Sequence, residues 1–280
     1  MADALRILAF GAHPDDCDLM VGGLAIKYAR LGHGVKLVAM CNGNAGHHVM
    51  GGGPLAQRRY AEAQRSAVIA SAGASGRVEY VVLDIPDCQL MPTLENRWTV
   101  VSMIREFQAD LVITNRPNDY HPDHRYTGIL VQDAAYMVTV PFFCPDVPAL
   151  KKNPVFAYFP DGFQKPTAFA PDVAVAIDSV IEKKLDAVLC MESQFIEGGC
   201  GGGLSRLASD PAQGAKQREG ARQGWAGRDK GHANRFRRTL IEFYGEERGA
   251  KVQYAEAFEI CEYGRRPSKE ELNKLFPFFD

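Results

Sequence analysis

The sequence predicts an α/β protein built on a Rossmann-like, mostly parallel sheet with helices on both faces. Two observations favour this fold class. Short apolar runs alternate with segments of helical spacing through the first half of the chain. The first such unit combines apolar runs over 6–10 and 35–40 with a helical pattern over 19–31. Its length of about 30 residues is typical of a β-α-β unit, and such units join right-handedly into parallel sheets.

The alternation continues along the chain, and each further element is assigned from its hydrophobic period. It predicts a helix over 57–72, a strand over 78–83, a helix over 93–108, a strand over 111–114 and a helix over 124–137. The repeated change of period indicates a doubly wound sheet, in which ligands bind at the carboxyl ends of the strands.

The regular alternation of strand-like and helix-like segments ends after Pro141. Apolar runs predict strands over 155–159 and 173–177, and helical spacing predicts a helix over 179–191. A glycine-rich break follows over 198–203, where the chain has little tendency to form regular structure.

We therefore expect a Rossmann-like domain over 1–140 that carries the functional site, and a smaller C-terminal lobe over 141–280 that is continuous with it. The stretch 210–232 is polar and short of aliphatic residues, and we interpret it as a mobile insertion. The glycine-rich loop over 41–53 is interpreted as a mobile surface loop near the site, with a lid that contacts substrate as the alternative. The sequence does not indicate the role of either segment.

Composition excludes several classes of protein. The net charge of -2 and the pI near 6.4 give no overall basic field, so we expect no nucleic-acid partner. No apolar run reaches the roughly 18 residues of a membrane span, and the N-terminus lacks a secretory pattern, so a cytoplasmic protein is expected. The seven cysteines are an odd number without a Cys-x-x-Cys pair, which argues against a disulfide framework.

Two short motifs carry residues suited to chemistry. His13-Pro-Asp-Asp16 follows the first predicted strand, and His121-Pro-Asp-His124 follows the strand over 111–114. Proline favours the first position of a helix, and residues three apart in a first turn share a face. Side chains 13 and 16 can therefore converge on one point, and side chains 121 and 124 on another.

If the two turns lie side by side, the site mixes imidazoles with a carboxylate, which suits Zn²⁺. Catalytic zinc keeps three protein ligands and one open position, so a His-Asp-His set would leave one carboxylate and one imidazole for proton transfer. Either motif alone would be better explained by helix capping. Because the two motifs hold three of the seven histidines, their combination favours a metal site.

The two motifs, over 12–16 and 119–125, resemble the PIG-L/LmbE-like zinc-dependent N-acetylglucosaminyl deacetylase family. Weaker similarities are spread over most of the chain, at Arg58, Arg59, Glu62, 171–173, 177–178, Lys184, 193–194 and 255–258. The resemblance implies that His13, Asp16 and His124 bind Zn²⁺. It also implies that Asp15 is the general base that takes a proton from the metal-bound water.

By the same resemblance, His121 as imidazolium stabilises the oxyanion and passes a proton to the leaving amine, and Asp123 orients a histidine. The family has Glu shortly after the aspartate pair, whereas this chain has Cys17 and Asp18. We expect this change to alter the support of the site and not its ligands.

Substrate contacts are assigned to Arg59, Tyr120 and Asp119, since the first suits a hydroxyl or phosphate and the other two flank the second motif. Trp98 and Trp225 are expected to make packing contacts. The predicted function is a zinc-dependent hydrolase that removes an N-acyl group, acetyl above all, from a sugar-like or other small-molecule amide. It is an amidohydrolase acting on a non-peptide C–N bond, and family members often form homo-oligomers.

Two alternatives stay open. A nucleotide-binding Rossmann oxidoreductase needs a Gly-x-Gly-x-x-Gly turn after the first strand, where this chain has carboxylates at Asp15 and Asp16. A non-catalytic zinc-binding or assembly protein would result if both histidines of the second motif closed the fourth coordination position. The sequence does not identify the N-acyl substrate, the physiological metal or the oligomeric state.

Overall fold

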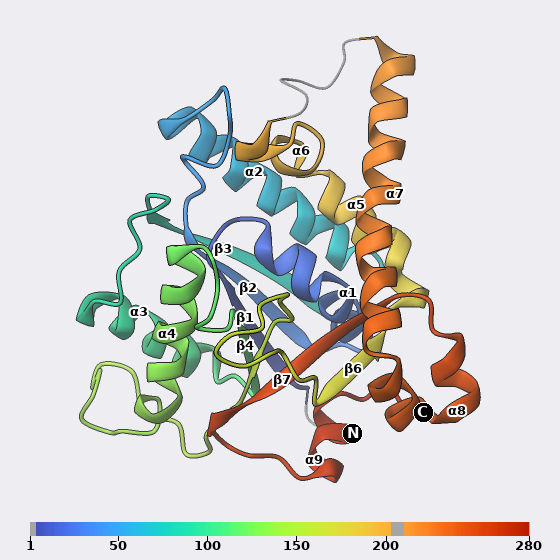
Figure 1. Ribbon diagram of the computed structural model, residues 1–280. Coiled ribbons are helices and arrows are strands. Elements are labelled where there is room, and N and C mark those ends of the chain that lie inside the picture. Colours follow the sequence, from blue (N-terminus) through green and yellow to red (C-terminus); the bar gives the residue numbers. More distant parts are fainter. Residues whose placement is uncertain (1–3, 203–209, 280) are drawn as a thin grey trace.

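The computed structural model describes residues 4–202 and 210–279, whose strands form one seven-stranded sheet between layers of helices (Figure 1). The strand order is β3-β2-β1-β4-β5-β7-β6. The strands are β1 Arg6–Gly11, β2 Gly34–Cys41, β3 Arg77–Ile85, β4 Leu111–Thr114, β5 Val155–Tyr158, β6 Val173–Ala176 and β7 Ala255–Gly264. The first five pair in parallel, and β7 runs antiparallel to β5 and β6. The expected mostly parallel α/β sheet is confirmed.

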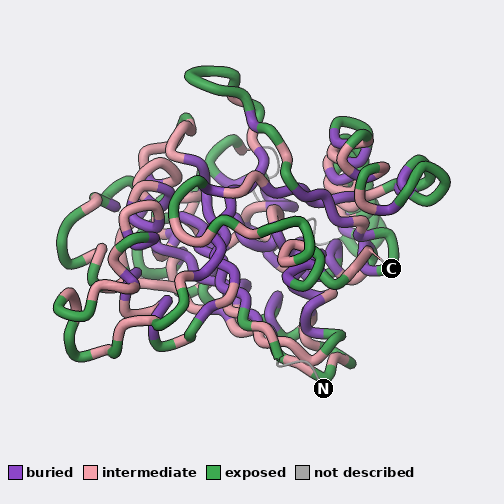
Figure 2. The backbone as a smooth tube through the Cα atoms, turned by 90° about the horizontal axis from the view of Figure 1, so that it is seen from below, coloured by how far each residue is buried: buried purple, intermediate pink, exposed green. Residues whose placement is uncertain are grey.

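Side chains alternate across β1, and this alternation divides the core into two. Ile7 and Ala9 pack into the cluster formed with α1, α2 and α5, whereas Leu8 and Phe10 pack into the cluster formed with α3 and α4. Burying a side chain such as Leu8 or Phe10 contributes about 1.5–3 kcal/mol. Helices therefore cover both faces of the sheet, and buried backbone fills the centre of the molecule in Figure 2.

Helices α1 to α5 follow the predicted order with some ends shifted, and α6 to α9 were not predicted. The helices are α1 Asp16–Arg30, α2 Gly52–Ser71, α3 Leu94–Phe107, α4 Pro122–Met137, α5 Ile181–Leu189, α6 Glu192–Phe195, α7 Pro211–Arg235, α8 Arg237–Lys251 and α9 Lys269–Leu275. Helices α1 and α4 begin inside the two His-Pro motifs, at Asp16 and at Pro122. The motif residues are therefore fixed by the first turns of two helices.

The second half of the chain completes the sheet of the first half. Strand β5 pairs with β4, and β7 joins β5 to β6. A third apolar cluster, including Phe169, Phe236 and Leu240, packs α7 and α8 against β6 and β7. The division into a domain over 1–140 and a lobe over 141–280 stays a prediction.

The interpretation of residues 210–232 as a mobile insertion is wrong, because they form most of helix α7 (Figure 1). Asp210 caps this helix by accepting a hydrogen bond from the Gln213 amide at 2.8 Å, and Pro211 occupies its first turn. Ion pairs to α5, such as Arg222 with Asp186 at 2.8 Å, hold it in place. The hydrophobic period did not predict this helix, because ion pairs with neighbouring helices take the place of much of the apolar stripe that an amphipathic helix usually has.

None of the helices in 4–202 and 210–279 has the length and hydropathy that crossing a bilayer requires.

A buried charge cluster links α1, α5, α7 and β7. Lys184 is 1% exposed, and its Nζ lies 2.7 Å from Asp229 Oδ2 and 2.9 Å from Glu256 Oε1. Glu256 also accepts hydrogen bonds from the amides of Gly23 and Leu24 on α1. Lys184 is therefore shared by both carboxylates, and Asp229 also pairs with Arg228 at 3.3 Å.

We predict that Lys184→Ala lowers the free energy of unfolding by about 3–5 kcal/mol, because it leaves the buried Glu256 without its ion pair and Asp229 with Arg228 alone. Urea titration followed by circular dichroism measures this loss. Lys251→Ala, which removes an exposed ion pair with Glu247, is the control and should change the free energy of unfolding by less than about 1 kcal/mol. Equal losses in the two variants would contradict a structural role for the buried cluster.

Candidate metal centre

The two His-Pro motifs meet where the strand order reverses. Strands β1 and β4 are parallel neighbours, with Phe10 opposite Thr114, and the chain leaves them toward opposite halves of the sheet. Such a switch point is where doubly wound sheets bind ligands. The first motif follows β1 directly, and His121 is the N-cap of α4.

Three side chains from the motifs surround one point. One ligand atom each of His13, Asp16 and His124 lies within 4.8 Å of the others. Asp16 Oδ2 lies 3.5 Å from His124 Nε2 and 3.8 Å from His13 Nδ1. The same oxygen accepts hydrogen bonds from the amides of Ala12 and His13 at 2.8 and 2.9 Å, which fixes the carboxylate. A Cβ at Gly11 would lie 2.6 Å from the Asp16 Cβ, so this position requires glycine.

Each of the two histidines is held by a carboxylate on its outer nitrogen. His13 Nε2 lies 3.2 Å from Asp123 Oδ2, and His124 Nδ1 lies 3.1 Å from Asp119 Oδ1. A carboxylate on one ring nitrogen fixes the tautomer and directs the lone pair of the other nitrogen toward a metal. His13 Nδ1 and His124 Nε2 therefore both present lone pairs toward Asp16.

The electrostatic field of the site favours a cation. Burial lowers the pKa of His13, but its hydrogen bond to Asp123 and the charges of Asp16 and Asp15 outweigh burial, so that the pKa is raised. The pKa of His124 is likewise raised to about 9, against burial, mainly by Asp16 and Asp119. Because carboxylates outnumber cations here, positive charge is stabilised, and two imidazoles with one carboxylate are ligands that suit zinc.

Two other groups in the described chain also bring three possible ligand atoms within 4.8 Å of one another, and both include His13. In the first, Asp87 is occupied by the amides of Gly43 and Ala45, and burial raises the pKa of the Cys41 thiol far above its ordinary value. In the second, His121 is joined by Asp123, whose Oδ2 already accepts from the Cys88 amide at 2.7 Å and faces His13. The set of residues 13, 16 and 124 fits a divalent ion better.

Asp15 and His121 lie beside this set and line the same cavity of about 450 Å³. Asp15 Oδ2 accepts a hydrogen bond from Arg59 Nη2 at 2.7 Å. Burial raises the pKa of Asp15, and the charge of Arg59 opposes this effect. Burial, followed by the charges of His13 and His124, lowers the pKa of His121.

The three expected substrate-contact residues differ in their exposure and in their hydrogen bonds. Tyr120 is 73% exposed and borders the cavity. Arg59 is 2% exposed, lines the cavity and is directed to Asp15. Asp119 is bonded to His124 Nδ1 and to the His121 amide. Their contacts with substrate stay predictions, and the site geometry gives Arg59 and Asp119 supporting bonds that the sequence did not indicate.

Other wall residues come from segments to which the sequence assigned no site residue. Trp225, expected to make only packing contacts, reaches the cavity from α7 and packs on Phe195 with ring centroids 4.8 Å apart. Gly46, in the loop over 41–53, faces the cavity, and its carbonyl accepts from Gln194 Nε2 at 3.0 Å. Only the fold brings these distant segments together.

Asp18, which follows the aspartate pair, points away from the cavity. It is 3% exposed and accepts a hydrogen bond from the Ser66 hydroxyl on α2. Burial raises its pKa to about 7. Its contact thus joins α1 to α2, which makes it a support of the site.

Fold and site together define a doubly wound α/β protein with a histidine-carboxylate cluster, a candidate cation site, at the switch point of its sheet. The chain belongs to the PIG-L/LmbE-like deacetylase family, as its motifs indicated: the family model described as PIG-L, GlcNAc-PI de-N-acetylase, matches residues 8–135. It is 32% identical over 202 residues to diacetylchitobiose deacetylase of Thermococcus kodakarensis, covering 70% of this chain and 72% of that protein.

Two further relatives differ in the activity that their names give. The structure of N,N'-diacetylchitobiose deacetylase from Pyrococcus horikoshii superposes with a TM-score of 0.65 at 25% identity, over 92% of this chain and 84% of that one. The 4-oxalmesaconate hydratase of Pseudomonas putida is 25% identical over 191 residues, which cover 67% of this chain and 73% of that protein. The relatives of this chain thus include a protein named for a reaction other than deacetylation.

We predict that replacing His13, Asp16 or His124 by Ala reduces bound zinc to near background, because each variant removes one of three ligands. Asp119→Asn should weaken zinc affinity by roughly 10–100-fold, since it loosens His124 without removing a ligand. Elemental analysis and competition with a chromogenic chelator measure these effects.

His33→Ala is the matched histidine control, because His33 accepts a hydrogen bond from the Leu5 amide and takes no part in the three groups. It should keep the zinc content of the unmodified protein. Full zinc occupancy in the His124→Ala variant would contradict the ligand set.

Proposed function

We propose that this protein is a zinc-dependent N-deacetylase that removes an acetyl group from an N-acetylated, sugar-like small molecule. One observation carries the proposal: His13, Asp16 and His124 converge in a cavity that is also lined by Asp15 and His121. Ligands, base and hydrogen-bond donor for amide hydrolysis are thus available within a single cavity. The two diacetylchitobiose deacetylases support the substrate class.

His13, Asp16 and His124 would hold the ion. When bound, zinc supplies a Lewis acid that polarises the acyl carbonyl and lowers the pKa of water toward neutrality. The carboxylates of Asp119 and Asp123 keep both imidazoles in the tautomer that ligation needs.

Asp15 would act as the general base. Its Oδ2 is bound by Arg59, which leaves Oδ1 to accept a proton from the attacking water. The guanidinium also favours the ionised carboxylate, which is the form that a base requires. After accepting the proton, Asp15 is an acid that can return it to the leaving amine.

His121 would stabilise the developing oxyanion through its outer nitrogen. As the N-cap of α4, its Nδ1 accepts a hydrogen bond from the Asp123 amide at 3.2 Å, so the neutral ring carries its proton on Nε2. The lowered pKa of His121 favours this neutral form. We therefore assign His121 a donor role from Nε2–H, in place of the imidazolium role that the resemblance implied.

A second candidate function is hydration of a carbon–carbon double bond, favoured by the similarity to 4-oxalmesaconate hydratase. The same residues could serve this reaction, because Asp15 can take a proton from water and deliver one to carbon. Amine release from an N-acetylated compound and loss of absorbance from an unsaturated acid distinguish the two reactions. The homo-oligomeric state and cytoplasmic location stay predictions.

We predict that Asp15→Asn keeps its zinc but loses roughly 10²-fold or more in the rate of amine release, because it removes the general base. The assay follows free amine from N,N'-diacetylchitobiose and N-acetylglucosamine with zinc-loaded protein. Chelation of zinc should abolish the activity of the unmodified protein, and added Zn²⁺ should restore it.

Asp133→Asn, which alters a pair with Arg97 outside the cavity, is the control and should leave turnover within about twofold of the unmodified protein. Unchanged turnover in Asp15→Asn would remove Asp15 from the role of base. Conversion of an unsaturated acid with no amine release would replace deacetylation by hydration.

A further inference from the structure

A second cavity, of about 510 Å³, adjoins the metal centre on the side of helix α7. It shares Asp16, Tyr120 and His124 with the first cavity, so a single small molecule can reach both. We call it the α7 cavity. Its remaining wall includes Arg228, His232 and Arg235 of α7, and Asn115 and Arg116 after β4.

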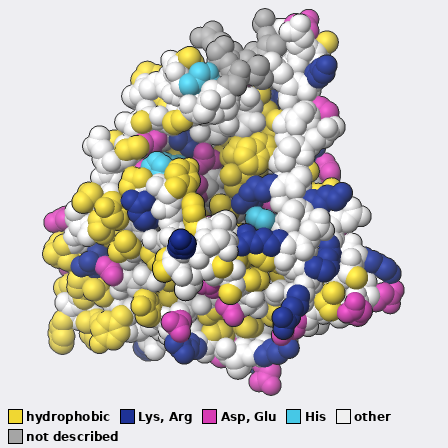
Figure 3. Space-filling view, in the orientation of Figure 1, with side chains coloured by type: hydrophobic (Ala, Val, Ile, Leu, Met, Phe, Trp, Pro, Cys, Tyr) yellow, Lys and Arg dark blue, Asp and Glu magenta, His cyan; other side chains and the backbone are white. Residues whose placement is uncertain are grey.

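One face of α7 spans both cavities. Trp225, Arg228, His232 and Arg235 are separated by three or four residues, which places them on one side of a helix. Trp225 borders the first cavity, and the other three border the α7 cavity. Basic side chains gather around a histidine beside the lower half of α7 in Figure 3. The helix thus offers an aromatic surface to one part of a ligand and positive charge to another.

Among the described residues, Arg235 is the arginine of the α7 cavity that has no ion pair with a carboxylate. Besides Asp16 and Asp119, which belong to that centre, its lining carries three arginines and a single carboxylate, Asp161. Arg116 pairs with Asp161 at 3.2 Å. Arg235 donates to the backbone carbonyl of Asp161 at 2.6 Å, which uses one of the five N–H donors of a guanidinium. Arg228 pairs at 3.3 Å with Asp229, which is not part of the lining. The charge of Arg235 therefore remains available to a ligand.

Two buried polar atoms of the lining residues have no hydrogen-bond partner within the described part of the chain, namely Asn115 Oδ1 and His232 Nδ1. Buried polar atoms are nearly always bonded, so a polar ligand is expected here. Burial and the charges of Arg228, Lys184 and Arg235 lower the pKa of His232 to about 3, in keeping with a positive field. His232 is therefore a neutral donor or acceptor between two arginines.

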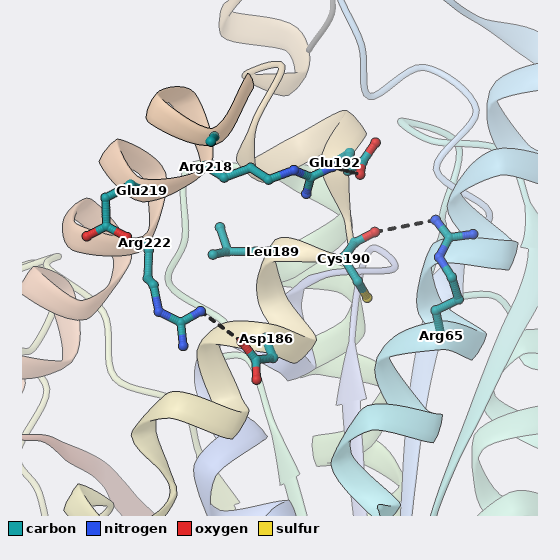
Figure 4. A pocket seen from close by; sticks show the side chains of 9 residues that line it. Arg65, Asp186, Leu189, Cys190, Glu192, Arg218, Glu219 and Arg222 are labelled. Atoms are coloured by element: carbon teal, nitrogen blue, oxygen red, sulfur yellow. Dashed lines mark hydrogen bonds and ion pairs between the residues drawn. The ribbon is translucent and has the colours of Figure 1, made fainter. Parts of the chain in front are cut away.

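A separate groove along α7 provides a contrast. Arg222 and Arg218 face α5 and α6 there, and Arg222 is paired with Asp186 (Figure 4). The charges of both arginines are matched by neighbouring carboxylates. Within the described chain, an arginine without an ion pair, Arg235, thus distinguishes the wall beside the metal centre from this groove.

We infer that the substrate carries an anionic group, a carboxylate or a phosphate, which binds to Arg228 and Arg235 in the α7 cavity while the acyl amide lies at the metal centre. The inference rests on the proposed deacetylase function. Guanidinium groups bind both anions through paired charge-assisted hydrogen bonds, so the two are one ligand chemistry for this site. The neutral N-acetyl sugars are then incomplete substrates.

Binding to zinc-loaded Asp15→Asn protein tests the inference without turnover. Isothermal titration calorimetry compares N-acetylglucosamine with N-acetylglucosamine 6-phosphate and with N-acetylmuramic acid, which carries a carboxylate. At least one anionic compound should bind roughly tenfold or more tightly than the neutral sugar. The better of the two identifies the anion as phosphate or carboxylate.

Arg235→Gln, added to the same protein, should reduce this preference to below about threefold and leave binding of the neutral sugar within about twofold. Arg235→Lys should restore part of the preference, which separates loss of charge from misfolding. Arg222→Gln on the same helix is the matched control and should keep the full preference. Arg228→Gln should act as Arg235→Gln does, if its melting temperature is unchanged.

Equal affinity for neutral and anionic compounds, or no detectable binding of either anion, would overturn the inference. A preference that survives both glutamine variants would also overturn it. Amine release by unmodified protein separates the two proposals. No release from any compound, with the anion preference intact, refutes the deacetylase and keeps the α7 cavity. Equal release from neutral and anionic compounds keeps the deacetylase and refutes the anion site.

Discussion

Four carboxylates and three imidazoles lie close together at the gap between β1 and β4, and their charge must be balanced for this edge of the sheet to be stable. Asp123 is fully buried, and its Oδ2 is held by His13 and the Cys88 amide. The raised pKa values of His13 and His124 show that the pocket takes up positive charge. The proposed divalent ion would supply that charge and bind the inner nitrogens that the carboxylates direct toward it.

The fold provides this arrangement through two helix starts. Because α1 begins at Asp16 and α4 at Pro122, each motif is fixed by a first helical turn, and the parallel pairing of β1 with β4 places the turns together. Helix α7, far along the chain, then closes one side of the site with Trp225 and with arginines. The strands thus set the position of the chemistry, and α7 sets the surroundings of the ligand.

The sequence predicted the sheet and the meeting of the two motifs, since both follow from hydrophobic period and from the short-range rules for helix starts. It could not predict the bonds of Arg59 to Asp15 or of Asp119 to His124, because each depends on side-chain directions within the folded site. Helix α7 was not predicted because ion pairs such as Arg222 with Asp186 attach much of it to the protein, so its sequence lacks a clear hydrophobic period. Strand β7 was not predicted either, although residues 255–258 within it resemble the family.

A crystal structure of the zinc-loaded protein, with diffraction data collected on both sides of the zinc absorption edge, tests the metal centre most directly. We expect one anomalous peak about 2.0–2.2 Å from His13 Nδ1, His124 Nε2 and an Asp16 oxygen, with Asp15 close to the ion but not bound to it. A peak bound instead by Cys41 and Asp87, or by His121 and Asp123, would contradict this assignment and with it the proposed chemistry.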